Sequence, residues 1–148
     1  MAEKNPEDLS PWSARVTVPV AWGEMDAFGH LNNAVYFRYF ENARIAYFER
    51  IGMLDFMQTS GIGPILASTE CRFRIPLTYP DTVDIDARVS EIAAQHFLMD
   101  YRVISRNANA VAATGGGRVV CLDYQTSKKA AVPEELRSAI AALEGRAL

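Results

Sequence analysis

Residues 33–51 constrain the fold of this chain more than any other stretch, because their apolar side chains recur with a helical period. One face of the expected helix carries Tyr36, Phe40, Ala43, Tyr47 and Ile51, widened by Val35, Tyr39 and Ala46. The charged residues lie mostly opposite, and Gly52 is a typical helix stop. A helix that is apolar around more than half of its girth must be covered by other structure. The sequence therefore predicts a long central helix wrapped by the rest of the chain.

The sequence around this helix has the period of β-strands. Apolar and polar residues alternate at 15–20, 71–75, 83–89 and 97–103, and a longer apolar run follows at 110–124. Short turns between the later strands favour antiparallel pairing. Pro133 opens a short C-terminal helix at about 133–143, with Glu134 and Glu135 in its first turn. These patterns predict an α+β fold, in which a curved antiparallel β-sheet of about five strands wraps the long helix.

Length and composition predict a single domain. The chain has 148 residues, of which 49% are hydrophobic, enough for a core without disulfides. Residues 1–11 are polar and are expected to form a flexible lead-in, and 12–148 the domain itself. The glycine run at 115–117 interrupts a strand pattern, and no helix start with Lys-Ser/Thr follows it. It therefore indicates a bulge or a close backbone approach rather than a phosphate-binding loop.

Charge and cysteine content exclude several classes of function. The net charge is −3, with both signs spread along the chain, which argues against nucleic acid or an anionic membrane as the main partner. Cys71 and Cys121 lie in apolar, strand-like runs and are expected to be reduced core thiols. The N-terminus is polar, and no apolar run reaches the length of a membrane span. We therefore expect a cytoplasmic protein without a signal peptide.

A short segment before the helix holds the candidate chemistry. Asp26 and Gly29 have the spacing of a type I turn, and Asn32 and Asn33 stand where a helix N-cap is expected. From spacing alone, a plain turn explains Asp26. A carboxylate beside a helix N-terminus can also attack an acyl carbon or activate water, and free backbone N–H groups can hold the developing oxyanion.

Other polar residues near this turn leave alternatives open. His30 is either a structural imidazole bonded to a backbone carbonyl or a hydrogen-bonding partner of the substrate or of Asp26. Glu24 is expected to be a solvated acid, although an extended segment would let it share a proton with Asp26. Glu41 is expected to pair with a helix arginine. The two histidines have no metal-ligand spacing with cysteines or carboxylates, so no metal site is expected.

The order of elements and the segment DAFGHLNNAVYFRYFENAR resemble the hotdog fold, specifically the 4-hydroxybenzoyl-CoA thioesterase-like acyl-CoA thioesterases. The family's local pattern falls here on Asp26, Gly29, His30, Asn32, Asn33, Tyr36, Tyr39, Glu41 and Arg44. The resemblance implies that Asp26 is the nucleophile or general base. It also implies an oxyanion donor at the helix start, most simply the backbone N–H of Asn33. Some family members carry a catalytic glutamate on the helix instead, which makes Glu41 the reserve candidate.

The resemblance further implies a hydrolase that cleaves a fatty or aryl acyl-CoA into free acid and CoA, with no cofactor beyond the CoA of the substrate. It implies a homodimer with the two sheets side by side, or a homotetramer, and active sites at the dimer interface. Two alternatives stay open: a non-catalytic acyl-CoA or ligand-binding module, and a thioesterase that acts on acyl-carrier protein. The cations available for CoA phosphates are Arg72, Arg74, Arg106, Arg118, Lys128 and Lys129, and the sequence singles out none of them.

Overall fold

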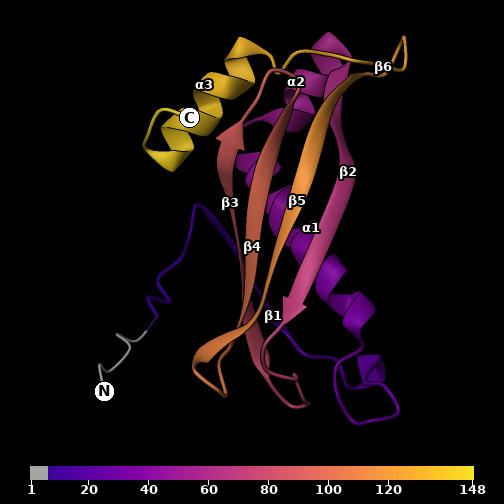
Figure 1. The fold of residues 1–148 in the computed structure, drawn as a ribbon, viewed down its shortest axis with the longest axis vertical. Helices are drawn as coiled ribbons and strands as arrows, with labels where there is room; N and C mark the ends of the chain where they lie inside the picture. Colours follow the sequence, from indigo (N-terminus) through magenta and orange to yellow (C-terminus); the bar gives the residue numbers. More distant parts are fainter. Residues whose placement is uncertain (1–6) are drawn as a thin grey trace.

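The computed structural model describes residues 7–148, and its main element is one antiparallel sheet (Figure 1). The strands are β1 (Ala14–Pro19), β2 (Ile62–Phe73), β3 (Thr82–Ile92), β4 (His96–Ser105), β5 (Ala110–Asp123) and the short β6 (Lys128–Lys129). The strand order is β1-β3-β4-β5-β2, with β6 paired to the end of β5. The predicted α+β fold with a curved sheet of about five strands is therefore confirmed, and β1 and β2 are its two edges.

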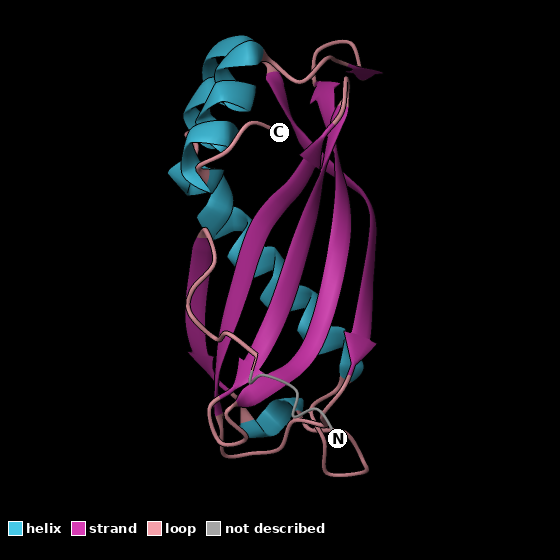
Figure 2. Cartoon of the chain, turned by 60° about the vertical axis from the view of Figure 1, so that its left-hand side comes forward, coloured by secondary structure: helices cyan, strands magenta, loops and turns pink. Residues whose placement is uncertain are grey.

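The long helix α1 (Asn33–Arg50) lies across one face of this sheet (Figures 1 and 2). Its buried side chains are Val35, Tyr36, Tyr39, Phe40, Ala43, Tyr47 and Phe48. Asn32 is the N-cap, because its side chain accepts the Ala34 N–H at 3.0 Å. Gly52 adopts a φ of +70° just beyond the helix, a conformation that glycine adopts without steric cost. The predicted central helix and its stop at Gly52 are both confirmed.

The glycines of β5 let this helix approach the sheet closely. A Cβ atom on Gly115 would lie 2.4 Å from Cε2 of Phe40, far inside van der Waals contact. Phe40 in turn stacks on Tyr101 of β4, with ring centroids 4.9 Å apart and planes inclined by 14°. The predicted close backbone approach at the glycine run is confirmed, and the packing of α1 on the sheet centre explains it.

Several elements differ from the prediction. Strand β2 begins at Ile62, well before the alternating pattern that starts at Cys71. Its first half contains Gly63 and Pro64, which break the strand pattern but are tolerated at a sheet edge. The helix α2 (Met53–Ser60) and the 3-10 turn η1 (Trp22–Glu24) are absent from the prediction. Met53, Phe56 and Met57 of α2 do have helical spacing, but with eight residues the helix is too short for periodicity alone to establish it.

The helix α3 (Glu134–Glu144) confirms the predicted C-terminal helix and begins directly after Pro133. At the other terminus, residues 1–6 of the expected lead-in lie outside the described residues. Within residues 7–11, the carbonyl oxygens of Asp8 and Ser10 accept hydrogen bonds from Arg102 at 2.8 and 2.7 Å. Arg102 also contacts the fully buried carboxylate of Asp86 at 2.8 Å. The segment that enters the domain is thus hydrogen-bonded to the outer face of the sheet.

Candidate active site

The turn at residues 26–29 positions the carboxylate of Asp26. The Gly29 N–H donates to the Asp26 carbonyl at 3.1 Å, and Gly29 adopts a φ of +78°. Oδ1 of Asp26 accepts the N–H groups of Phe28 at 2.8 Å and His30 at 3.2 Å. The turn interpretation of Asp26 is therefore correct in geometry. The turn uses only Oδ1 of the carboxylate, and Oδ2 has no donor among the described residues. Asp26 can therefore stabilise the turn and still react through Oδ2.

Backbone hydrogen bonds join this turn to the domain just before α1. The Leu31 N–H donates to the carbonyl of Leu77 at 2.8 Å, and the Asn32 N–H donates to the carbonyl of Glu24 at 2.9 Å. The side chain of Leu31 is buried in the core. Asp26 is therefore held in a fixed place beside the N-terminus of α1, on a loop anchored at both ends.

A pocket of about 240 Å³ opens beside this helix N-terminus. It is lined by Asp26, His30, Leu31, Asn33, Tyr36, Phe73, Arg74, Ile75 and Pro76. The three residues proposed from the sequence, Asp26, His30 and Asn33, thus line one pocket. The sequence reasoning does not place the wall formed by the end of β2, which is distant from the turn in the chain. Alternation of Phe73 with Cys71 marks that strand, but no local signal connects it to Asp26.

The backbone N–H of Asn33 has the properties of an oxyanion donor. Asn33 is the first residue of α1, and within residues 7–148 its N–H donates to no acceptor. The N-terminus of an α-helix carries a partial positive charge, which favours an anion placed beside it. Asn33, whose N–H is unpaired, and Asp26 therefore line the same pocket, and addition to a carbonyl carbon requires a donor and a carboxylate of this kind.

Tyr36 and Phe73 form the aromatic wall of the pocket. Their ring centroids lie 4.9 Å apart at an interplanar angle of 90°. Burial raises the pKa of the Tyr36 phenol above its ordinary value, so this side chain stays neutral and keeps its proton at neutral pH. The wall is therefore uncharged and suits an apolar or aromatic acyl group.

Asp26 also lines a wider hollow of about 570 Å³, together with Trp22, Gly23, Met25, Ala27, Gly29 and Tyr79. Trp22 is 74% exposed, and Phe28 of the Asp26 turn is 85% exposed. Asp26 is thus shared by the small pocket and a wider hollow beside exposed aromatic side chains. A substrate longer than the small pocket has apolar surface to follow in this hollow.

The other titratable residues differ in how they relate to this pocket: His30 lines it, whereas Glu24 and Glu41 do not. The imidazole of His30 is exposed and has no hydrogen-bond partner among the described residues, so the expected bond to a backbone carbonyl is not formed. Glu24 lines a separate hollow with Arg38, Glu41 and Asn42, rather than the pocket of Asp26. Glu41 forms no ion pair within 4.0 Å in the described part of the chain, contrary to the expected pairing with a helix arginine.

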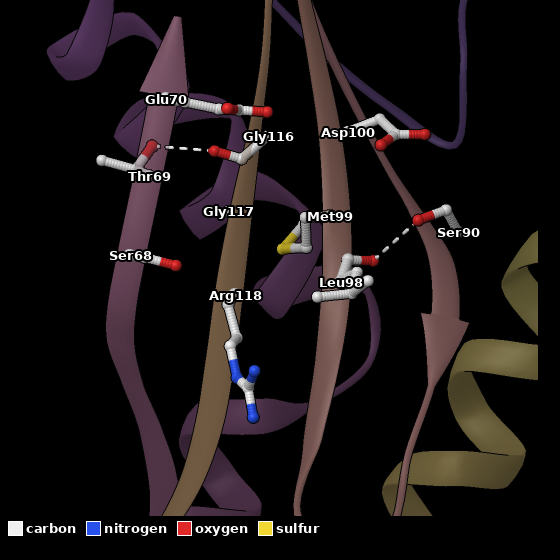
Figure 3. A pocket seen from close by; sticks show the side chains of 10 residues that line it. All are labelled: Ser68, Thr69, Glu70, Ser90, Leu98, Met99, Asp100, Gly116, Gly117 and Arg118. Carbon is white, nitrogen blue, oxygen red and sulfur yellow. Dashed lines mark hydrogen bonds between the residues drawn. The ribbon is translucent and has the colours of Figure 1, made fainter.

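Another hollow, of about 370 Å³, lies on the outer face of the sheet, away from α1 (Figure 3). It is lined by Ser68, Thr69, Glu70, Ser90, Leu98, Met99, Asp100, Gly116, Gly117 and Arg118. None of the residues proposed for chemistry borders it. No group of three or more His, Cys, Asp or Glu side chains in residues 7–148 could hold a metal ion. The described helices include none with the length and hydropathy to span a bilayer.

Known proteins resemble this chain in sequence and in structure. Residues 20–140 match the family model described as the thioesterase-like superfamily. A thioesterase from Thermus thermophilus, solved in complex with coenzyme A and zinc, is 32% identical with a TM-score of 0.83, and the match covers 95% of this chain and 100% of the Thermus chain. The long-chain acyl-CoA thioesterase FadM of Escherichia coli is 24% identical, over 76% of this chain and 86% of FadM.

A third relative matches over a shorter length. The chain is 29% identical to YsmA of Bacillus subtilis over 84 residues, which cover 57% of this chain and 56% of YsmA. The match thus spans little more than half of that relative, whereas the Thermus structure is matched over its whole length. The family model covers most of the chain, including the Asp26 turn, α1 and the strands β2 to β5. The chain belongs to the thioesterase-like superfamily, and it is a thioester hydrolase with the hotdog fold.

Proposed function

We propose that this chain hydrolyses acyl-CoA thioesters, with Asp26 as nucleophile or general base and the backbone N–H of Asn33 as oxyanion donor. One observation carries the proposal: Asp26, with a free carboxylate oxygen, and Asn33, with an unpaired helix N-terminal N–H, line the same pocket. Thioester hydrolysis needs these two groups and little else, because a thiolate is a good leaving group. A strong general acid is therefore not required.

The reaction can follow either of two routes, which differ in the role of Asp26. As general base, Asp26 takes a proton from water while the hydroxide portion adds to the acyl carbon, and collapse of the tetrahedral intermediate breaks the C–S bond. As nucleophile, Asp26 forms a mixed anhydride and expels the thiolate, and water then cleaves the anhydride. In both routes the carbonyl oxygen gains negative charge at the N-terminus of α1. The products are the free acid and the thiol of CoA.

The surroundings of Asp26 support a fatty or aryl acyl group. The small pocket has the uncharged aromatic wall of Tyr36 and Phe73, and the exposed Trp22 and Phe28 extend the apolar surface beyond it. The Thermus relative was solved with coenzyme A, and FadM is a long-chain acyl-CoA thioesterase, which supports CoA as the thiol carrier.

We further propose that two copies pair at the edge strand β2. This strand is long and exposes Ile65, Leu66 and Phe73, while its outer backbone groups have no partner strand in the described chain. An uncovered edge with apolar side chains is a natural pairing surface for a second sheet. The two sheets then lie side by side, and the wall of the Asp26 pocket at the end of β2 comes next to the partner. A homotetramer is built by pairing two such dimers.

Thiol release from a panel of aromatic and aliphatic acyl-CoAs tests this function, with wild type and Asp26→Asn side by side. We expect release with wild type and its near-complete loss in the variant. Wild-type turnover in Asp26→Asn would remove Asp26 from the mechanism and make Glu41 the next candidate.

A non-catalytic binding module and an acyl-carrier-protein thioesterase are the alternatives. Binding of acyl-CoA without thiol release would indicate the module. Release from acyl-carrier protein but from none of the CoA esters would indicate the other carrier. We propose a cytoplasmic location, and fractionation of the producing cell tests that placement.

A further inference from the structure

Arg74 occupies a fixed position at the rim of the Asp26 pocket. It follows directly after the last residue of β2. The backbone N–H groups of Arg74 and Ile75 both donate to the carbonyl of Ala112, at 2.8 and 3.0 Å. This shared acceptor fixes the main chain at the point where it leaves the sheet. Arg74 lines the pocket together with Asp26 and Asn33.

Arg74 is the single lysine or arginine among the described residues that line this pocket. The pocket also contains the Asp26 carboxylate, and the whole chain carries a net charge of −3. An anionic substrate is repelled by such surroundings unless a cation lies near its path. The planar guanidinium of arginine matches both carboxylate and phosphate geometry. Arg74 is therefore placed where a negative substrate needs a positive group.

The present partner of Arg74 is a carboxylate of the N-terminal segment. Nη1 of Arg74 lies 3.6 Å from Oε2 of Glu7, and the two side chains are 49% and 52% exposed. A pair this long and this exposed is weak, because water screens it. The contrast with Asp86 is clear: that carboxylate is fully buried and contacts Arg15 at 2.6 Å and Arg102 at 2.8 Å. Another anion can therefore replace Glu7 as the partner of Arg74. The buried ion pairs of Asp86 are not open to such replacement.

We propose that Arg74 binds an oxyanion of the substrate at the rim of the Asp26 pocket, and that Glu7 holds the guanidinium until this oxyanion displaces it. The inference rests on the proposed function for the identity of the substrate as a thioester. The oxyanion is either a phosphate of the thiol carrier or a carboxylate at the far end of the acyl group. Glu7 then acts as an internal competitor that lowers the affinity for anionic substrates.

Kinetics with three thioesters separate the two sources of the oxyanion. The first is a CoA ester of an uncharged acyl group, the second is the same acyl group on phosphate-free N-acetylcysteamine, and the third is an N-acetylcysteamine ester whose acyl chain ends in a carboxylate. The variants are Arg74→Gln and Glu7→Gln, with Arg72→Gln as the matched control. Arg72 is an exposed arginine of β2 that does not line the pocket.

Arg74→Gln should raise KM about twofold to fivefold, the factor typical of an exposed charge pair, for the thioester that carries the recognised oxyanion. Glu7→Gln should lower KM for that same thioester, and added salt should reduce both effects. An effect confined to the CoA ester identifies the carrier phosphates. If KM changes for the N-acetylcysteamine ester with a terminal carboxylate, and not for the one without it, the recognised oxyanion is the carboxylate of the acyl group. Equal effects of Arg74→Gln and Arg72→Gln, or no effect of Glu7→Gln, would overturn the proposal.

Binding measured by calorimetry keeps this test separate from the test of hydrolysis. CoA and the carboxylate-bearing thioester are each titrated into Asp26→Asn, which is not expected to hydrolyse the thioester. Arg74-dependent binding without turnover in the wild type would support the role of Arg74 and contradict the proposed enzymatic function. Turnover with a KM that neither Arg74→Gln nor Glu7→Gln changes would support the function and contradict this inference.

Discussion

The backbone N–H of Phe28 donates to Oδ1 of Asp26 at 2.8 Å, so the candidate catalytic carboxylate also stabilises the turn that carries it. The His30 N–H donates to the same oxygen at 3.2 Å. The turn therefore uses one oxygen of this side chain and leaves the other free for the proposed chemistry. This division allows the two roles of Asp26 to be separated by substitution.

Asp26→Asn should abolish most turnover and leave the fold intact. The amide oxygen can still accept the two backbone N–H groups, but the side chain can no longer act as nucleophile or base. Thiol release should fall by about 10²–10⁴, the usual contribution of a positioned acid–base group. Asp26→Ala should lose the same activity and, because two donors lose their acceptor, about 1 kcal/mol of the free energy of unfolding as well. Equal stability of the two variants in urea titrations would contradict the structural role of Oδ1.

Gly115→Ala should destabilise the protein, because the new Cβ would lie 2.4 Å from Cε2 of Phe40 and 2.6 Å from the carbonyl oxygen of Glu70. We expect a loss of about 1–3 kcal/mol in the free energy of unfolding, as for other overpacked cores. Gly116→Ala is the matched control, since its nearest contact would be an ordinary 3.5 Å to the carbonyl oxygen of Met99. Urea titrations that show the same midpoint for both variants would refute this account of α1 packing.

Asp84 should contribute to acid denaturation. Its partial burial would raise the carboxyl pKa, but hydrogen bonds from Arg106 and Thr17 and the charge of Arg15 outweigh burial, and the pKa is lowered from its ordinary value of 3.8. A carboxyl group whose folded pKa is depressed stabilises the fold above the unfolded pKa, and this contribution is lost as the pH falls through the folded pKa. The free energy of unfolding of wild type should therefore decline below pH 3.8.

The matched variant for this titration is Asp84→Asn, which should be less stable than wild type at neutral pH and should lose less stability on acidification. Thermal unfolding at several pH values between neutrality and strong acid measures the difference. Parallel curves for the two proteins would show that the ion pairs of Asp84 do not contribute to folding.

The protein should be at least dimeric in solution. Light scattering should give a mass of two or more copies of the 16.4 kDa chain. Leu66→Lys places a charge on the exposed edge strand β2 and should shift the mass toward one copy, whereas Ser138→Lys on α3, away from that edge, should leave it unchanged. A mass near 16.4 kDa for wild type would contradict pairing at β2.

Periodicity predicts most of the fold because most elements have one buried face. The pattern indicates β1 at 15–20, where the strand spans Ala14–Pro19, and α1 at 33–51, where the helix spans Asn33–Arg50. The first half of β2 escapes prediction because Gly63 and Pro64 break the alternating pattern there and imitate a loop.

The sequence predicts the part of the candidate site formed by the Asp26 turn and the start of α1, but not the part formed by the end of β2. The turn and the helix N-terminus are local in sequence, so Asp26, His30 and Asn33 can be proposed from spacing and from the resemblance to hotdog thioesterases. Phe73 and Arg74 complete the same pocket from the end of β2, and this meeting depends on the pairing of β2 with β5 across the sheet. Long-range pairing of this kind has no signature in one sequence.

The strand order also affects how the chain can fold during synthesis. Helix α1 leaves the ribosome before any of the strands β2 to β5, yet its Phe40 packs beneath Gly115, far toward the C-terminus. A nascent chain released with α1 complete therefore presents an exposed aromatic segment with no sheet to receive it. A chain that terminates before β5 lacks the strand on which Phe40 packs, and the apolar surface left exposed makes such a product prone to aggregate.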